Sequence, residues 1–316
     1  MPPELQPNPR EWGFDVAQAL QSVAALRAVV PEDAFTAGTL GTERAGSAVH
    51  IRDGLLLTVG YLITEASEVW LRLAGGGVVP GHALAYDHVT GFGLVQALGK
   101  LPVPALELGE SRRVRPGSPV IVAAAGGIGA AVAAKVAARQ EFAGYWEYLL
   151  EDAIFTLPAH PFWGGAAVIG TDGKLVGIGS LVLQQGGGEG RRVDTNMAIP
   201  AEALLPVLDD LLRYGRVNRP ARPWLGLYAM EDDDALAVGG LADGGPADQA
   251  GVRAGDRILA VNDAEVPDLA GLWRAVWATG GAGCVVSLTL GRGTRAVTVP
   301  VQSGDRTRFL KAPRMH

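Results

Sequence analysis

The sequence contains a single cysteine, Cys284, among its 316 residues. One thiol excludes both a disulfide framework and a cysteine-rich zinc site. A lone cysteine among valines is more typical of a small buried apolar residue than of a nucleophile. Excess positive charge is also missing, because the formal net charge is −6 and no basic run interrupts the chain. Nucleic acid is therefore not expected as the main partner.

Long hydrophobic runs are missing as well. The best early candidate, Val16–Val30, is interrupted by four polar residues. No stretch reaches the roughly 18 apolar residues that a membrane span needs. The first basic side chain is Arg10 and Glu11 follows it, whereas a signal peptide begins with positive charge and continues with an apolar core. We therefore expect a cytoplasmic protein without a membrane partner.

Glycine and proline, by contrast, are abundant, with 44 and 20 residues. From about Ala48 onward, short apolar runs alternate with glycine-rich turns. Typical runs are Leu55–Thr58, Val69–Leu73 and Pro119–Val122, and typical turns are Gly75–Gly77, Gly126–Gly127 and Gly186–Gly188. This alternation predicts short strands in a β-barrel or sandwich. The alanine-rich segment Gly129–Ala138 stays open, because its composition favours a helix and its neighbours favour a strand.

Three segments carry apolar residues at helical spacing. They are Phe14–Val30, Ala201–Leu212 and Pro267–Ala278. After the second segment, two prolines between residues 216 and 223 predict a linker. After the third, Val285–Leu290 and Arg295–Val301 have the composition of two closing strands.

The region after the linker resembles a PDZ domain. The resemblance is carried by Gly245–Asn262, which includes Ala250-Gly251, Ala254-Gly255-Asp256-Arg257 and the strand that follows. Together with Met197–Pro200 and Arg222–Leu227, this region is similar to the junction in HtrA/Deg serine proteases. In that family a trypsin-like double β-barrel precedes a PDZ domain.

This resemblance, which covers residues 46–302, implies a mainly β protein. We expect a short N-terminal helix, a chymotrypsin/trypsin-like double β-barrel and a PDZ domain. The expected boundaries are 1–35 for the helical segment, 36–215 for the barrels, 216–223 for the linker, 224–303 for the PDZ domain and 304–316 for a C-terminal tail.

The catalytic positions depart from the family pattern. By the resemblance, the histidine position falls on Tyr61, the aspartate position on Gly91 and the serine position on Trp163. The segment Gly170–Ile178 matches the strand pair after the nucleophile and fixes this register. Acyl transfer needs a nucleophile, a base that titrates near neutrality and an orienting carboxylate. None of the three residues supplies its group, since tyrosine ordinarily has a pKa near 10 and indole offers only an N–H donor.

Pro161 removes a further element of catalysis. The family's oxyanion hole uses the backbone N–H of the nucleophile and of the residue two positions earlier, which here is Pro161. Proline has no backbone N–H. Loss of one such donor costs roughly 10²–10³ in kcat, in addition to roughly 10⁶ for a lost triad.

Other residues could form a substitute site. His88 and His160 belong to loops that face the cleft in the family, and Asp87 could join them as a metal ligand. Three ligands are the minimum for zinc, so we favour ordinary surface or loop histidines, and we expect neither metal nor cofactor. Glu151 and Asp152 are adjacent, and on a strand they point to opposite faces, which predicts solvated charges rather than a paired-acid site.

Tyr61 and Trp163 have two interpretations. We favour aromatic side chains that plug the former cleft, and the alternative is an aromatic-lined pocket for a small ligand or peptide.

The favoured function is that of a catalytically inactive pseudoprotease that binds protein or peptide C-termini through its PDZ domain. The residues expected to bind the peptide are Trp224, Leu225, Gly226, Leu227, Leu272 and Val276. One alternative is a serine-type endopeptidase with a non-standard site, for which Ser47 and Ser180 are the nearest hydroxyls. Another is a structural assembly factor, since relatives commonly form trimers and a homo-oligomer is possible.

Overall fold

The computed structural model describes residues 1–186, 192–232 and 235–312. These residues form two compact units. The first unit contains Met1–Gln140, Asp152–Val217 and the segment from Lys311, and the second contains Glu141–Glu151 and Asn218–Leu310. The assignment of Glu141–Glu151 to the second unit differs from the expected boundaries, which placed these residues with the barrels.

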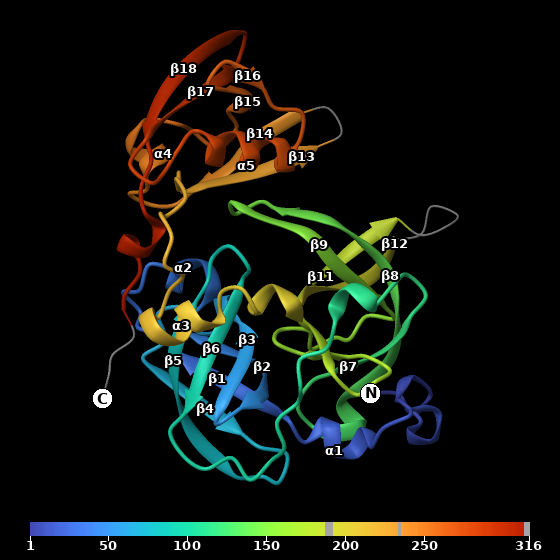
Figure 1. The fold of residues 1–316 in the computed structure, drawn as a ribbon. Helices are drawn as coiled ribbons and strands as arrows, with labels where there is room; N and C mark the ends of the chain where they lie inside the picture. Colours follow the sequence, from blue (N-terminus) through green and yellow to red (C-terminus); the bar gives the residue numbers. More distant parts are fainter. Residues whose placement is uncertain (187–191, 233–234, 313–316) are drawn as a thin grey trace. The chain divides into compact units, whose positions relative to one another are not determined.

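The first barrel is a closed sheet of six antiparallel strands, drawn from blue to cyan in Figure 1. Its strands are β1 (Val23–Val29), β2 (Glu43–Arg52), β3 (Leu55–Val59), β4 (Glu68–Arg72), β5 (Val78–Tyr86) and β6 (Phe92–Ala97). They lie in the order β1-β2-β3-β6-β5-β4, and β1 pairs with β4 to close the ring. Apolar residues such as Leu57, Leu71 and Leu94 are fully buried.

The second barrel has the strand order β10-β11-β12-β9-β8-β7. Its strands are β7 (Pro119–Ala123), β8 (Ala131–Gly144), β9 (Tyr148–Leu157), β10 (Ala167–Ile169), β11 (Leu175–Gly186) and β12 (Arg192–Pro200). The open question of Gly129–Ala138 is thus answered as a strand for most of its length. Val132, Ala134 and Val136 alternate into the core, and this period of two is the geometry of a strand.

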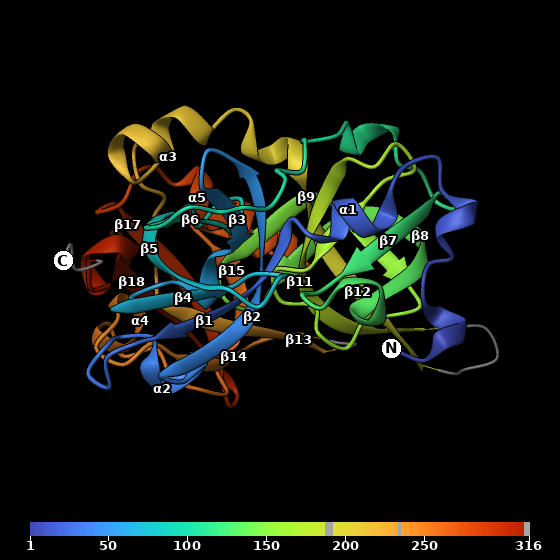
Figure 2. The same ribbon diagram turned by 90° about the horizontal axis from the view of Figure 1, so that it is seen from below.

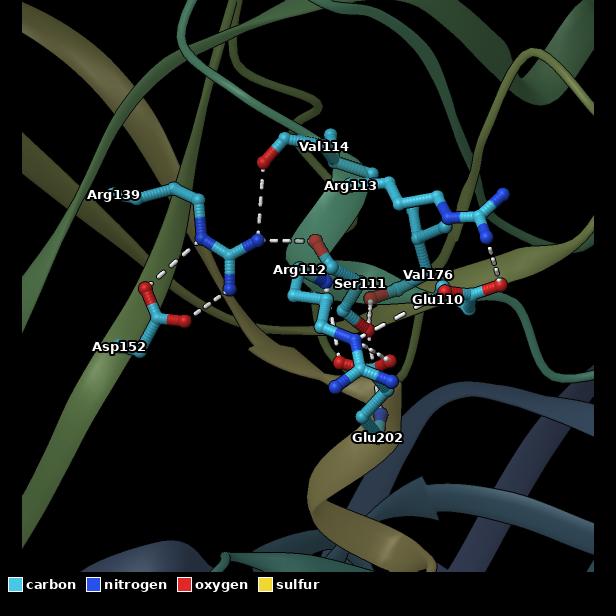
Figure 3. A network of polar contacts seen from close by, with 9 residues as sticks. All are labelled: Glu110, Ser111, Arg112, Arg113, Val114, Arg139, Asp152, Val176 and Glu202. Carbon is cyan, nitrogen blue, oxygen red and sulfur yellow. Dashed lines mark hydrogen bonds and ion pairs between the residues drawn. The ribbon is translucent and has the colours of Figure 1, made fainter.

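A polar network ties three parts of the second barrel together (Figure 3). Arg139 on β8 donates to both carboxylate oxygens of Asp152 on β9 and to the carbonyls of Ser111 and Val114. The Ser111 hydroxyl donates to the Val176 carbonyl at 2.7 Å. The segment that precedes β7 is therefore fixed on the barrel by side chains.

Two of the three expected helices differ from the structure. Within Phe14–Val30 only Val16–Leu20 is helical (α1), and after a turn at Gln21–Ser22 the chain continues as strand β1 (Val23–Val29). In β1 the buried Leu26 and Ala28 flank the exposed Arg27, and pairing with β2 and β4 outweighs the helical propensity of alanine. The expected segment 1–35 therefore includes a barrel strand.

The helix expected at Ala201–Leu212 is interrupted. It forms a short 3-10 turn, η7 (Ala201–Leu204), followed by α3 (Leu208–Tyr214). Pro206 lies between them, and a proline inside a helix removes one hydrogen bond and clashes with the preceding turn. α3 packs against β5 of the first barrel (Figure 2).

The second unit is built around a six-stranded sheet. Its strands are β13 (Leu227–Asp232), β14 (Ala235–Leu241), β15 (Arg257–Val261), β16 (Ala264–Glu265), β17 (Val285–Arg292) and β18 (Arg295–Gln302). Its helices are α4 (Pro246–Gln249) and α5 (Leu269–Ala278). The helix expected at Pro267–Ala278 is confirmed as α5, with Asp268 as its N-cap. Trp273 and Val276 on α5 are fully buried in the core of this unit.

The remaining elements are short. They are η1 (Pro3–Leu5), η2 (Pro9–Glu11), α2 (Ala37–Leu40), η3 (Gly60–Leu62), η4 (Ser111–Arg113), η5 (Gly127–Ala130) and η8 (Arg306–Phe309). Across the described residues, no helix has the length and apolar character to cross a membrane. Part of the expected turn Gly186–Gly188 and the end of the expected tail, with His316, lie outside the described residues. The expected fold class, a mainly β double barrel followed by a PDZ-type sheet, is confirmed.

Candidate functional site

Tyr61 stands in η3, at the expected histidine position. Its hydroxyl donates to the Ser180 carbonyl at 2.8 Å. Burial raises the pKa of the Tyr61 hydroxyl above its usual value. The hydroxyl therefore keeps its proton near neutral pH and cannot serve as a general base.

Gly91 stands at the expected aspartate position, in the turn before β6. Its backbone has a φ of +84°, a left-handed conformation that strongly favours glycine. The turn is fixed from both sides, because Gly91 N–H donates to Asp87 O and Gly60 N–H donates to Gly91 O, both at 2.8 Å. The position lacks a carboxylate and is shaped for a residue without a side chain.

Trp163 stands at the expected serine position, in a loop that is fixed by backbone hydrogen bonds. Ala166 N–H donates to the Trp163 carbonyl at 3.0 Å, and Ser47 N–H donates to the Gly164 carbonyl at 2.8 Å. At Gly165, with φ of +74°, an added Cβ would lie 1.8 Å from the Ser47 carbonyl oxygen. The backbone thus holds a tight turn between the two barrels of the first unit.

The histidine beside this loop has a structural role. His160 is fully buried, and its Nδ1 accepts from Phe162 N–H at 3.0 Å. Its Nε2 therefore carries the proton and donates to the Ala130 carbonyl at 2.9 Å. Burial lowers the pKa of the imidazole. The expectation of a surface or loop histidine holds for His160 as a loop residue, and the structure adds that it is buried and orients the loop.

The other residues considered for a substitute site are dispersed in different environments. The His88 ring packs on Tyr86, with centroids 4.2 Å apart. Asp87 accepts from the backbone N–H of Val89 and Thr90. Glu151 and Asp152 are both exposed. Within the described ranges, no three His, Cys, Asp or Glu side chains are grouped closely enough to hold a metal ion.

An open pocket of about 440 Å³ lies where the family resemblance places the active-site cleft. It is lined by Ala25, Ala45, Gly46, Ser47, Tyr61, Leu62, Ala124, Ala125, Pro161, Phe162, Trp163 and Gly164. Tyr61 and Trp163 both line this open pocket, so the plug and the aromatic-lined pocket stay the two interpretations of these side chains. Ser47 is buried and its Oγ accepts from Ala125 N–H at 3.2 Å, so the hydroxyl contacts an amide rather than a base.

The second unit holds a distinct site at the start of β13. The backbone N–H groups of Leu225, Gly226 and Leu227 donate to the carboxylate of Glu147 at 3.1, 2.7 and 3.0 Å. Gly226 has a φ of +71°, which lets successive N–H groups point to one place. This loop is a carboxylate-binding site by its geometry.

The other expected peptide-binding residues, Trp224, Leu272 and Val276, lie around this loop and donate no backbone N–H to the Glu147 carboxylate. Trp224 N–H donates to the Gly304 carbonyl at 3.0 Å, and its ring packs on Phe309 at 4.7 Å. Trp224 therefore supports the loop. Leu272 and Val276 are fully buried in the same core cluster as Leu225 and Leu227.

Sequence reasoning missed Glu147. Burial raises the pKa of its carboxyl to about 7. The backbone N–H groups of Leu227, Leu225 and Gly226 and the charge of Arg306 act in the opposite direction and lower this pKa. One signal was present in the sequence. Four aromatic residues, Phe142, Tyr145, Trp146 and Tyr148, surround this acid in a chain with only 6% aromatic residues.

Comparisons with known proteins agree with this architecture. Residues 46–178 match the family model of the trypsin-like peptidase domain, and residues 223–302 match that of the PDZ domain. A probable periplasmic serine endoprotease DegP-like of Rhizobium meliloti is 27% identical over 295 residues, which cover 87% of this chain and 56% of the relative. The periplasmic serine endoprotease DegP of Salmonella typhimurium is 24% identical over 276 residues, covering 82% and 56%.

The chain spans about half the length of the curated relatives that it matches. Among solved structures, the HtrA-type protease AlgW with a decapeptide is similar, with a TM-score of 0.53 and 22% identity. The match covers 95% of this chain and 98% of AlgW. At this identity the similarity concerns the fold.

Proposed function

We propose that this chain is a pseudoprotease. It is an HtrA/DegP-like homologue in which a trypsin-like peptidase domain is followed by a C-terminal PDZ domain. It acts by binding the C-termini of proteins or peptides through the PDZ domain. The observation that carries the first half is the joint state of Tyr61, Gly91 and Trp163, which supply no base, no orienting carboxylate and no nucleophile.

The chemistry of acyl transfer supports this proposal. A hydrolytic serine needs a base within hydrogen-bond reach to remove its proton. The Tyr61 hydroxyl donates its proton to the Ser180 carbonyl and is also hydrogen-bonded by the Trp163 side chain, and Pro161 offers no N–H for a developing oxyanion. The Ser47 Oγ accepts an amide N–H instead of pairing with a base, and the Ser180 side chain is buried, which disfavours the alternative of a peptidase with a relocated nucleophile.

The binding half of the proposal is supported by the loop Leu225–Leu227. Its three N–H groups converge on one carboxylate, and a C-terminal peptide presents a carboxylate at the end of an extended strand. In this mode main-chain hydrogen bonds provide affinity and one or two side-chain pockets provide specificity. The apolar Leu225, Leu227, Leu272 and Val276 favour a hydrophobic last residue. The related AlgW was solved with bound peptides.

Oligomeric state and location are further parts of the proposal. Resemblance to HtrA proteins favours a homo-oligomer, for which mass measurement in solution is the test. The cytoplasmic location expected from the sequence remains a prediction, and cell fractionation tests it, since the relatives above are named periplasmic.

A peptide screen tests the proposed function. The full chain is titrated with fluorescent decapeptides that end in Leu, Val or Phe, and binding is followed by anisotropy. The matched control uses the same peptides with an amidated C-terminus. We expect at least about tenfold weaker binding after amidation, because the three N–H groups lose a charged acceptor. Equal binding of free and amidated peptides, or no binding at all, would contradict the proposal.

A further inference from the structure

The turn between β8 and β9 presents a carboxylate in an unusual way. Glu147 has a φ of +61°, a conformation that costs a residue with a side chain about 1–2 kcal/mol. Trp146 and Tyr148 stack on each other on either side of it, with centroids 5.7 Å apart. Phe142 packs on both rings. A strained turn persists where its surroundings hold it in place, and here aromatic packing holds the turn from which the buried Glu147 carboxylate reaches the loop Leu225–Leu227.

The same segment also lies along the first strand and helix of the PDZ unit. Ala229 N–H on β13 donates to the Tyr145 carbonyl at 2.9 Å. The buried Trp273 indole N–H on α5 donates to the Gly144 carbonyl at 2.8 Å. Ala143 packs against the core cluster of the unit. A backbone hydrogen bond to the strand and a carboxylate in the loop at the start of that strand are two features of a bound C-terminal peptide.

We propose that residues 141–148 are an internal ligand of the PDZ groove, in which the Glu147 side chain takes the place of a partner's terminal carboxylate. This inference rests on the proposed function, because it concerns the same groove. A partner must then displace the segment, and it needs the same chemistry: a free terminal carboxylate on an extended peptide.

The contacts divide between those that a peptide can replace and those that it cannot. A peptide can supply the acceptors for Leu225, Gly226, Leu227 and Ala229. It cannot restore the packing between Tyr145 and Tyr228, whose centroids are 6.1 Å apart. Displacement therefore costs free energy, and the apparent dissociation constant of a peptide equals its intrinsic constant divided by the open fraction. If about 1–10% of molecules are open, removal of the internal ligand tightens peptide binding about 10- to 100-fold.

Two variants of the full chain remove the internal carboxylate. Glu147→Ala deletes the carboxylate. Glu147→Gly also deletes it and relieves the backbone strain of the positive φ, so the test does not depend on whether the alanine variant folds. Glu151→Ala is the matched control, because Glu151 is an exposed acid of the same hairpin. The probe is a pool of fluorescent decapeptides ending in Leu, Val or Phe.

The first readout is amide hydrogen exchange of residues 224–230, which needs no peptide. We expect exchange at least tenfold faster in both Glu147 variants than in wild type and in Glu151→Ala. The second readout is peptide affinity, which we expect to rise at least tenfold in the Glu147 variants alone.

Unchanged exchange in Glu147→Gly would overturn the inference, and so would equal peptide affinity of wild type and Glu147→Gly. In the second case the proposed function would stand. Faster exchange with no peptide bound by any protein would uphold the internal contact and overturn the peptide-binding function instead.

Discussion

Gly91 illustrates at the level of one residue how the backbone at the expected aspartate position departs from the family pattern. An aspartate at this position would have to adopt a φ of +84°, which glycine adopts without cost and an aspartate does not. The turn that Asp87 and Gly60 hold therefore favours glycine, at a modest cost to aspartate, since Asp53 and Asp263 of this chain also have positive φ.

The triad variant Tyr61→His, Gly91→Asp, Trp163→Ser is consequently expected to remain inactive. Position 91 is strained, and Pro161 still offers no oxyanion donor. The measurement is cleavage of unfolded casein by the triple variant and by the quadruple variant that adds Pro161→Gly. Protease rates typical of an active relative in the triple variant would refute the argument from Pro161 and Gly91.

Gly165 permits a second test at this scale. Its φ is +74° and an added Cβ would lie 1.8 Å from a backbone oxygen, whereas Gly117, with φ of +89°, has open space there. Gly117→Ala should cost about 1–2 kcal/mol from backbone strain alone. Gly165→Ala should cost more than about 4 kcal/mol, because the clash is added. The measurement is chemical denaturation of the full chain, and similar losses in both variants would show that the turn is not close-packed.

The elements show where local sequence was sufficient and where it was not. α5 was predictable because its apolar face and its N-cap Asp268 agree. β1 was not, since Val23–Val29 carries alanines that favour a helix and becomes a strand only by pairing with β2 and β4. The break at Pro206 was predictable in principle from the proline alone.

The β8–β9 hairpin carries a pH prediction at the scale of an element. With the segment docked, burial raises the pKa of Glu147 from 4.5 to about 7, while Arg306 and the three backbone N–H groups oppose the shift. The docked state thus binds the proton more tightly than the free state. Its extra stability is fully present below about pH 4.5 and is lost as pH rises through about 7.

Between pH 5.5 and pH 8, the amide hydrogen exchange rate of residues 224–230 should therefore increase by a larger factor than the intrinsic chemical exchange rate does. Glu147→Gly should show the intrinsic dependence only. A wild-type profile that follows the intrinsic rate would disprove the pH dependence.

At the scale of the whole molecule, composition predicted short strands in a barrel or sandwich, and the resemblance to HtrA/Deg proteases added the double barrel followed by a PDZ domain. Neighbouring motifs also predict that the triad and oxyanion positions fall on Tyr61, Gly91, Trp163 and Pro161. They could not predict that Glu141–Glu151 belongs to the second compact unit. That grouping depends on hydrogen bonds between residues about 80 positions apart, as between Glu147 and Gly226, which no local pattern encodes.

The central claim is that this chain keeps the fold of a serine protease without its chemistry. Labelling of the purified full chain with a fluorophosphonate probe tests it most directly, with an active HtrA-type protease as the positive control. The account predicts that mass spectrometry finds no modified serine, Ser47 and Ser180 included. Stoichiometric labelling of any serine that is lost on denaturation would contradict it.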